Sequence, residues 1–210
     1  MGDISAALHA NPQISNQELA QVVIDALEAW SGQWETEAWA GTLTMSAVRT
    51  DRLATVAARV DALSEAYLTR EDHFRELIDA VRPRLTSFGP YLFDIHTLAQ
   101  ELLEEEEDQE IRVALLGLLE AMDDAVLAEA SGSNWPGAQG LTIFLPDQAN
   151  AGRLAHYTGV TMGLDFVENT RWDELLTSYL GQPAAAQRGL SPLPCSTANG
   201  LIPPTDRSCF

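Results

Sequence analysis

The chain has 210 residues, enough to bury one sizeable core, and hydrophobic residues make up 46% of it, as is usual for a globular protein. Its 12 basic residues, all arginine because the sequence has no lysine, oppose 31 acidic residues and give a formal net charge of -19. So acidic a surface repels phosphate backbones and anionic lipid, which argues against nucleic acid and membranes as partners.

Two readings of this acidity remain open. It suits a basic ligand, or it reflects no more than solubility, the host's genome or a salty environment. No apolar run is long enough for a membrane span, and no basic segment followed by an apolar one stands at the N-terminus. We therefore expect a soluble chain without a signal peptide, and the sequence leaves its location in the cell unknown.

The N-terminal third predicts a helix and then a strand. Ser15 and Glu18 have the spacing of a capping box, and apolar residues recur at helical spacing from there to Trp30. Residues 42–48 alternate in polarity and are rich in β-branched types, which predicts a strand.

Helices are expected next. Asp51 is placed to cap a long helix with a buried stripe that ends at Tyr67, and a helix from about Glu71 should end or bend at Pro83. Residues 87–93 read as a loop.

The middle of the chain predicts further helices and a hairpin. Asp94 begins a helix that runs into the acidic residues 104–108, and another helix follows from about residue 108 to 122. Residues 125–130 and 141–145 read as strands, joined by Gly-, Asn- and Pro-rich loop chemistry, so we expect the two strands to pair with each other.

The last segment changes character. A helix with Trp172, Leu175, Leu176 and Tyr179 on one face is expected to close the domain before Leu180. Prolines are then scattered among Ser, Thr and Ala, without periodicity. The expected organisation is one domain over residues 1–180 and a disordered tail over residues 181–210.

Several stretches resemble the C-terminal region of clostripain-like cysteine peptidases, which have a caspase-like fold. The resemblance rests on ALHANPQISNQELAQVVIDAL (7–27), TLTMSAVRTDRLATVAARVDAL (42–63), YLFDIHTLAQ (91–100), GLTIFLP (140–146) and LDFVENTRWDELLTSYL (164–180), in the family's order. It covers about residues 3–180. It implies a fold that is α+β and mostly helical with a few strands, similar to the C-terminal half of a caspase-like α/β peptidase fold without its catalytic part.

The catalytic residues of that family have no counterpart in this sequence. In the family a His and a nucleophilic Cys follow successive core strands, and both belong upstream of Met1 in this register. An acidic residue of the specificity pocket, which favours cleavage after basic residues, also belongs upstream. Asp3 is close to it in register, but a mobile surface residue is the simpler reading.

The residues themselves offer no convincing site, so we assign no catalytic, cofactor-binding or metal-binding residue. Cys195 and Cys209 stand in the tail, far from any pattern that would hold a thiolate against an imidazole. The histidines, which are spread along the chain, read as structural: His9, His73, His96 and His156.

Two other features have a functional and a structural reading. The acidic run 104–108, with Glu110, lacks the spacing and glycine of a calcium loop and reads as a solvated helix end. Trp135, in an Asn-Trp-Pro-Gly loop, is either a ligand contact or the cover of a hydrophobic edge.

The resemblance implies a non-catalytic C-terminal portion of a cysteine endopeptidase, inactive alone and without a cofactor, whose partner is an N-terminal peptidase part or a second copy. A peptide substrate is expected only in the complete enzyme, and whether the chain itself is an enzyme stays open. The alternatives are a stand-alone protein-interaction module that kept this scaffold, or an acidic helical protein unrelated to peptidases. The last would be favoured if no strand at residues 141–145 packed beside the closing helix.

Overall fold

The structure is a computed structural model that describes residues 2–32, 40–159 and 163–181. The α-helices that it describes are α1 (Gly2–Ala10), α2 (Asn16–Gly32), α3 (Leu53–Leu68), α4 (Glu71–Val81), α5 (Ile95–Glu105), α6 (Gln109–Ala125), α7 (Leu154–Tyr157), α8 (Asp165–Asn169) and α9 (Trp172–Tyr179). The strands are β1 (Thr44–Val48), β2 (Leu92–Asp94), β3 (Val126–Ser131) and β4 (Thr142–Phe144). The fold is therefore α+β, mostly helical with short antiparallel strands.

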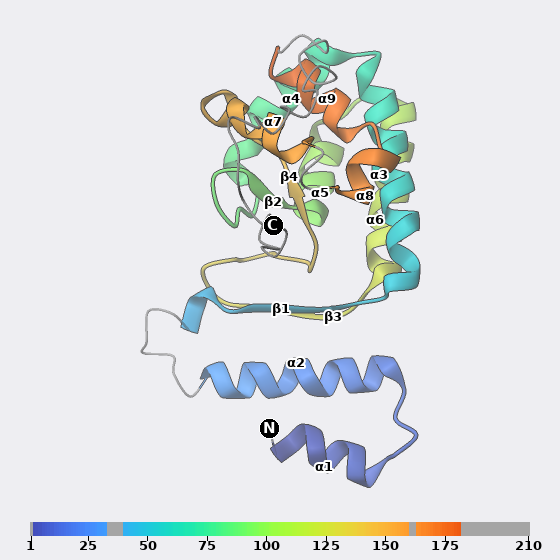
Figure 1. The fold of residues 1–210 in the computed structure, drawn as a ribbon, viewed down its shortest axis with the longest axis vertical. Helices are drawn as coiled ribbons and strands as arrows, with labels where there is room; N and C mark the ends of the chain where they lie inside the picture. The colour runs from blue at the N-terminus through green and yellow to red at the C-terminus, as the bar shows by residue number, and fades with distance from the viewer. Residues whose placement is uncertain (1, 33–39, 160–162, 182–210) are drawn as a thin grey trace, which may run out of the picture.

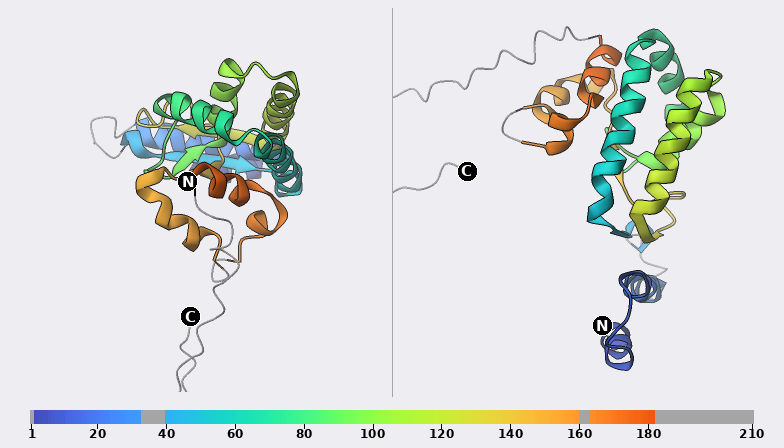
Figure 2. Two further views of the ribbon diagram at one scale, coloured as in Figure 1. Left: turned by 90° about the horizontal axis from the view of Figure 1, so that it is seen from above. Right: turned by 90° about the vertical axis from the view of Figure 1, so that its right-hand side faces the viewer.

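Helices α3 to α6 form the body of the molecule, with β2, β4 and α9 packed against them (Figure 1). Helix α3 lies along α6, and α5 packs against α6 as well (Figure 2). The predicted apolar stripes supply the main core, in which the largest fully buried side chains are Trp172, Tyr67, Phe74, Leu63, Ile78, Leu102, Ile111, Leu115, Met122, Leu145 and Leu154.

The strands pair differently from the hairpin that the sequence predicts. Strand β3 pairs with β1, with Ala128 opposite Ala47, and β4 pairs with β2, with Ile143 opposite Phe93. The connection 132–141 leaves one ribbon and enters the other, so its turn chemistry does not close a hairpin. Both strands were predicted correctly, and their partners were not, because each partner lies far away in the sequence.

The β1–β3 ribbon stands between the body and helix α2, which covers one of its faces (Figure 1). A small second core forms there, made of Ala20 and Ile24 from α2 with Ala128 and Ala130 from β3. The predicted capping box of α2 is confirmed, since the amide of Glu18 donates to Ser15 Oγ (3.2 Å) and the amide of Ser15 donates to Glu18 Oε2 (3.0 Å). Helix α1, which packs on α2, was not predicted.

The closing helix is attached to β4 through a buried tryptophan. Trp172 is 1% exposed, and its indole Nε1 donates to the carbonyl of Phe144 at 2.7 Å. The predicted closing helix is α9, and the short helix α8 before it is separated from it by extended backbone at Thr170. Strand β4 therefore packs beside the closing helix.

Two local predictions were wrong. Asp51 does not cap α3, because it lies in a 3₁₀ turn (Thr50–Arg52) with its carboxylate on Arg49 at 3.1 Å. The expected loop 87–93 ends in strand β2. Asp94 does cap α5, since it accepts from the amide of Thr97 at 2.8 Å.

Trp34, Trp39, Cys195, Cys209 and the tail from residue 182 lie outside the described residues. Within the described part, no helix has the length and apolar character that a membrane crossing requires.

Candidate functional site

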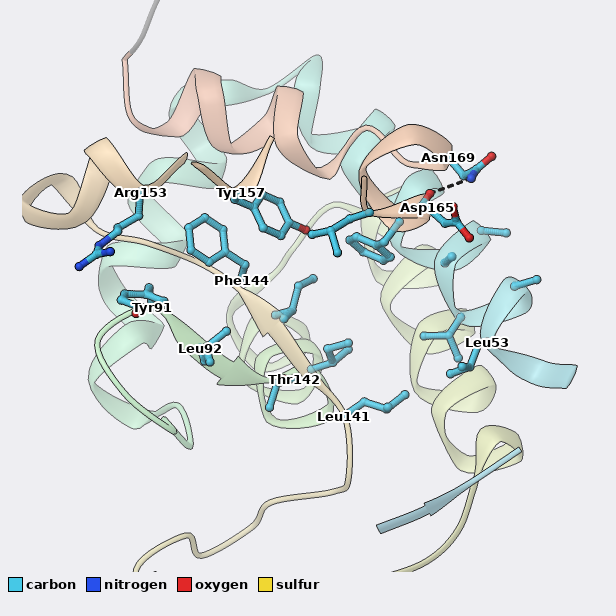
Figure 3. Close-up of a pocket in the computed structure, with 18 of the residues that line it drawn as sticks. Leu53, Tyr91, Leu92, Leu141, Thr142, Phe144, Arg153, Tyr157, Asp165 and Asn169 are labelled. Carbon is cyan, nitrogen blue, oxygen red and sulfur yellow. Dashed lines mark hydrogen bonds between the residues drawn. The ribbon is translucent and has the colours of Figure 1, made fainter. Parts of the chain in front are cut away.

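An apolar groove of about 1100 Å³ lies beside β4. We call it the β4 groove. One wall is the first half of α3, the floor is the β2–β4 ribbon, and the other wall is formed by α7 and α8 (Figure 3). Its apolar lining is made by Leu53, Ala54, Val56, Ala57, Ala58, Tyr91, Leu92, Ile95, Leu141, Ile143, Phe144, Tyr157, Leu164 and Phe166.

The groove is open because small side chains line its α3 wall. Ala54, Ala57 and Ala58 leave room that larger residues would fill. Apolar surface consequently stays uncovered, and Leu53 and Leu92 keep 39% and 36% of their area exposed. A contiguous exposed apolar surface of this kind usually marks an interaction site or a ligand-binding groove.

Strand β4 offers an unpaired edge on the groove side. Within the described residues its only strand neighbour is β2. The carbonyl of Leu141 accepts from Ile95, and the amide of Leu145 donates to the carbonyl of Tyr91. Because backbone groups alternate along a strand, those of Thr142 and Phe144 point to the opposite side. The Phe144 carbonyl already accepts from Trp172, so Thr142 offers the backbone groups with which a further strand could pair.

The polar side chains at the groove do not form a catalytic arrangement. Arg153 lies over the ring of Tyr91, 5.9 Å from its centroid, and the Asn169 side chain donates to the carbonyl of Asp165 at 2.7 Å (Figure 3). His156 is exposed and stands without a cysteine or serine nucleophile in the lining. The groove can bind apolar groups, but its side chains offer no nucleophile with a base.

The histidines of the chain are not brought together. His9 lies on α1 and His156 on α7, both exposed, while His73 and His96 stand in the first turns of α4 and α5. The described residues include no cysteine, so they contain no Cys–His pair. Asp3 belongs to α1. No group of three or more His, Cys, Asp or Glu side chains within the described ranges is placed to hold a metal ion.

The acidic run is not solvated throughout, which corrects the sequence-based reading. Glu106 is 2% exposed, and its carboxylate accepts from the Tyr67 hydroxyl (3.0 Å) and from the amide of Asp108 (2.9 Å). Nε2 of His73 lies 3.0 Å from both carboxylate oxygens. Burial by itself would raise the pKa of Glu106, but these hydrogen bonds outweigh it and lower the pKa. Glu106 therefore connects α3, α4 and the start of α6.

A second buried carboxylate lies where the body meets the β1–β3 ribbon. Asp94 accepts from the amides of Thr97 and Gln139, both at 2.8 Å, yet burial dominates and raises its pKa. Burial also raises the pKa of Glu129 on β3, helped by the charge of Asp94. His96, Glu129 and Gln139 line a small hollow of about 170 Å³. The bond from the Gln139 amide to Asp94 connects β2 to the segment that follows the β1–β3 ribbon.

Trp135 has a structural role. Its indole Nε1 donates to the carbonyl of Thr42 at 3.0 Å, and its ring centroid lies 5.2 Å from that of Phe88. It covers an edge between the β1–β3 ribbon and the loop before β2.

The β1–β3 ribbon is the second place where a strand edge is unpaired. Among the described residues β1 has no strand neighbour besides β3, and Met45 on β1 is 38% exposed. A two-stranded ribbon is marginally stable alone, and α2 covers only one of its faces. Within the described residues, the β1 edge is therefore open for a further strand to pair.

Comparison with known proteins adds no relative, because no protein-family model, curated protein or solved structure matches the chain. The fold and the site by themselves define a mostly helical α+β chain with an apolar groove and an open-edged ribbon.

Proposed function

We propose that this chain is the non-catalytic C-terminal portion of a clostripain-like cysteine endopeptidase, which completes the fold of the enzyme and is inactive alone. The observation that carries the proposal is the β1–β3 ribbon with its open β1 edge. The order of the sequence stretches that resemble the family supports it independently, since 42–48 and 140–146 each contain a strand.

The ribbon suits a partner that supplies the rest of a sheet. In a caspase-like fold the strands that carry the catalytic His and Cys precede this region, so their sheet would continue at β1. Pairing there would satisfy the free backbone groups of β1 and cover Met45. The core between α2 and the ribbon is small, since it consists of three alanines and one isoleucine, so a further strand would add to the stability of the ribbon.

The chemistry would then belong to the complete enzyme. A thiolate, deprotonated by the His, would attack the peptide carbonyl, and backbone N–H groups would stabilise the oxyanion. The described part of this chain has no cysteine, so its contribution would be to hold the sheet and shape the substrate groove.

A stand-alone protein-interaction module is the second candidate, and the β4 groove is the observation that favours it. An open apolar groove with a free strand edge binds extended peptides in several unrelated folds. The alternative of an unrelated helical protein would have been favoured by the absence of a strand beside the closing helix. Strand β4 does pack beside α9, through Trp172, so this observation does not favour that alternative.

The test is an activity assay on peptides with Arg or Lys before the scissile bond, with the chain alone and with the product of the adjoining reading frame. We expect no turnover by the chain alone and thiol-sensitive cleavage by the combination. Intact neighbouring frames that lack both a His and a Cys after apolar strands would leave the interaction module as the better proposal.

A further inference from the structure

We propose that the β4 groove is an intramolecular docking site for the chain's own C-terminal segment, residues 182–210. The peptidase proposal is not needed for this inference, because the docking can be tested with the chain alone. The argument depends on the shape of the groove, on where the segment begins and on its chemistry.

The shape of the groove favours an extended segment over a small molecule or a folded partner. Its volume of about 1100 Å³ is at the upper limit of small-molecule sites. Its charged side chains do not converge on one point, because Arg153 stands at one end of the groove and Asp165 at the other (Figure 3). The free edge of β4 lies between the walls formed by α3 and α8, so a second copy could not bring its own sheet edge beside it without meeting those walls (Figure 3). A single strand fits between them.

The C-terminal segment begins close to the groove. Trp172, at the start of α9, contacts the carbonyl of Phe144 in β4, and α9 ends at Tyr179, seven residues further on. At 1.5 Å per helical residue, the end of α9 lies about 10 Å from that contact along the helix axis, and the segment starts three residues later. Its 29 residues, at about 3.3 Å each when extended, reach any part of the groove. The other stretches outside the description, 33–39 and 160–162, are short and joined at both ends.

The composition of the segment matches the groove. It carries Leu190, Leu193, Leu201 and Ile202, which have the aliphatic character of the lining. Prolines at five positions favour extended backbone, while residues 195–202 have no proline and keep every N–H for pairing with the edge of β4. The segment holds two arginines and one aspartate in a chain whose net charge is -19, so charge does not oppose docking.

Docking within one chain also needs little intrinsic affinity. A tether of this length presents the segment at an effective concentration on the order of 1 mM. Burial of a few aliphatic side chains is sufficient at that concentration, whereas a free peptide of the same sequence would bind weakly.

Hydrogen exchange of the full chain tests the docking. We expect exchange at residues 195–202 and at β4 to be slowed about tenfold or more relative to a chain that carries Leu201→Asp with Ile202→Asp. The matched control, Ser196→Asp with Thr197→Asp, adds the same charge to the same segment and should keep most of the protection. Ala58→Trp, which fills the groove from α3, should abolish protection of the segment, and Ala80→Trp on the exposed face of α4 should not.

Three results would overturn the inference. Exchange of residues 195–202 at the rate of an unstructured peptide in the full chain would show that nothing docks. Protection that survives Ala58→Trp, in a variant whose circular dichroism and Tm match those of Ala80→Trp, would place the segment elsewhere. Protection that disappears on dilution would assign the groove to the segment of a second copy, which contradicts docking within one chain.

Discussion

Replacement of Glu106 by alanine should destabilise the protein strongly, although the residue belongs to a run of acids. The change removes the acceptor of the Tyr67 hydroxyl, which is fully buried, and of the amide of Asp108. A buried hydroxyl without an acceptor costs about 1–3 kcal/mol, and the small cavity adds about 1 kcal/mol more. We count little for the ion pair with His73, because that imidazole is 40% exposed.

The expected loss is therefore about 2–4 kcal/mol, or a fall in Tm of roughly 5–15 °C for a domain of this size. Urea unfolding followed by circular dichroism measures it. Glu104→Ala, an exposed residue of the same run, is the control and should change stability by less than about 0.5 kcal/mol. Equal stabilities for the two variants would refute the role assigned to Glu106.

The contribution of Glu106 to stability should decrease as the pH falls. The pKa of Glu106 is lower in the folded chain than its ordinary value of 4.5, so its contribution is present above that value and is lost as the pH falls through the folded pKa. The stability difference between the parent chain and Glu106→Gln should accordingly shrink below about pH 4.5. A difference that grows on acidification would contradict the hydrogen-bond account.

Three further variants test the closing helix. Trp172→Phe keeps an aromatic ring but removes the bond to the Phe144 carbonyl and part of the buried ring, and it should cost at least about 1–2 kcal/mol in urea unfolding. Burial raises the pKa of Asp173 from 3.8 to about 7, so the folded chain loses stability as the pH rises between those values. Asp173→Asn should thus raise Tm at pH 8 and have a smaller effect at pH 4; an equal effect at both would contradict this. Arg171→Ala removes the 2.7 Å ion pair with Asp61. Because the Arg171 side chain is 40% exposed, the loss of stability should be less than about 1 kcal/mol, and it should be smaller still in high salt.

The sequence predicts most helices of this fold because their apolar stripes are regular. The faces of α3 and α4 emerge as expected, and the capping residues Ser15 and Asp94 mark two helix starts correctly. Asp51 fails as a cap because two neighbouring arginines attract its carboxylate, an effect that spacing alone does not reveal.

Strand partners could not be predicted in the same way. Residues 125–130 and 141–145 have strand character and turn-forming residues between them, which is the usual signal of a hairpin. Their real partners, β1 and β2, precede them by about 80 and 50 residues, and packing of the whole body selects those pairs. Strand β2, with three residues, is too short for any alternation to show.

The site was also only partly visible. Leu98, Leu102 and Glu106 are spaced by four residues, so the stripe of α5 already pointed to a buried position at Glu106. The β4 groove had a weaker signal in the alanines beside the stripe of α3. Whether those alanines leave an open groove depends on α7 and α8, which arrive about 100 residues later.

The measurement that tests the account most directly is hydrolysis of an Arg- or Lys-containing peptide by the purified chain, alone and after mixing with the product of the adjoining reading frame. The account predicts no turnover by the chain alone and thiol-sensitive cleavage by the mixture. Thiol-sensitive cleavage by the chain alone would contradict it.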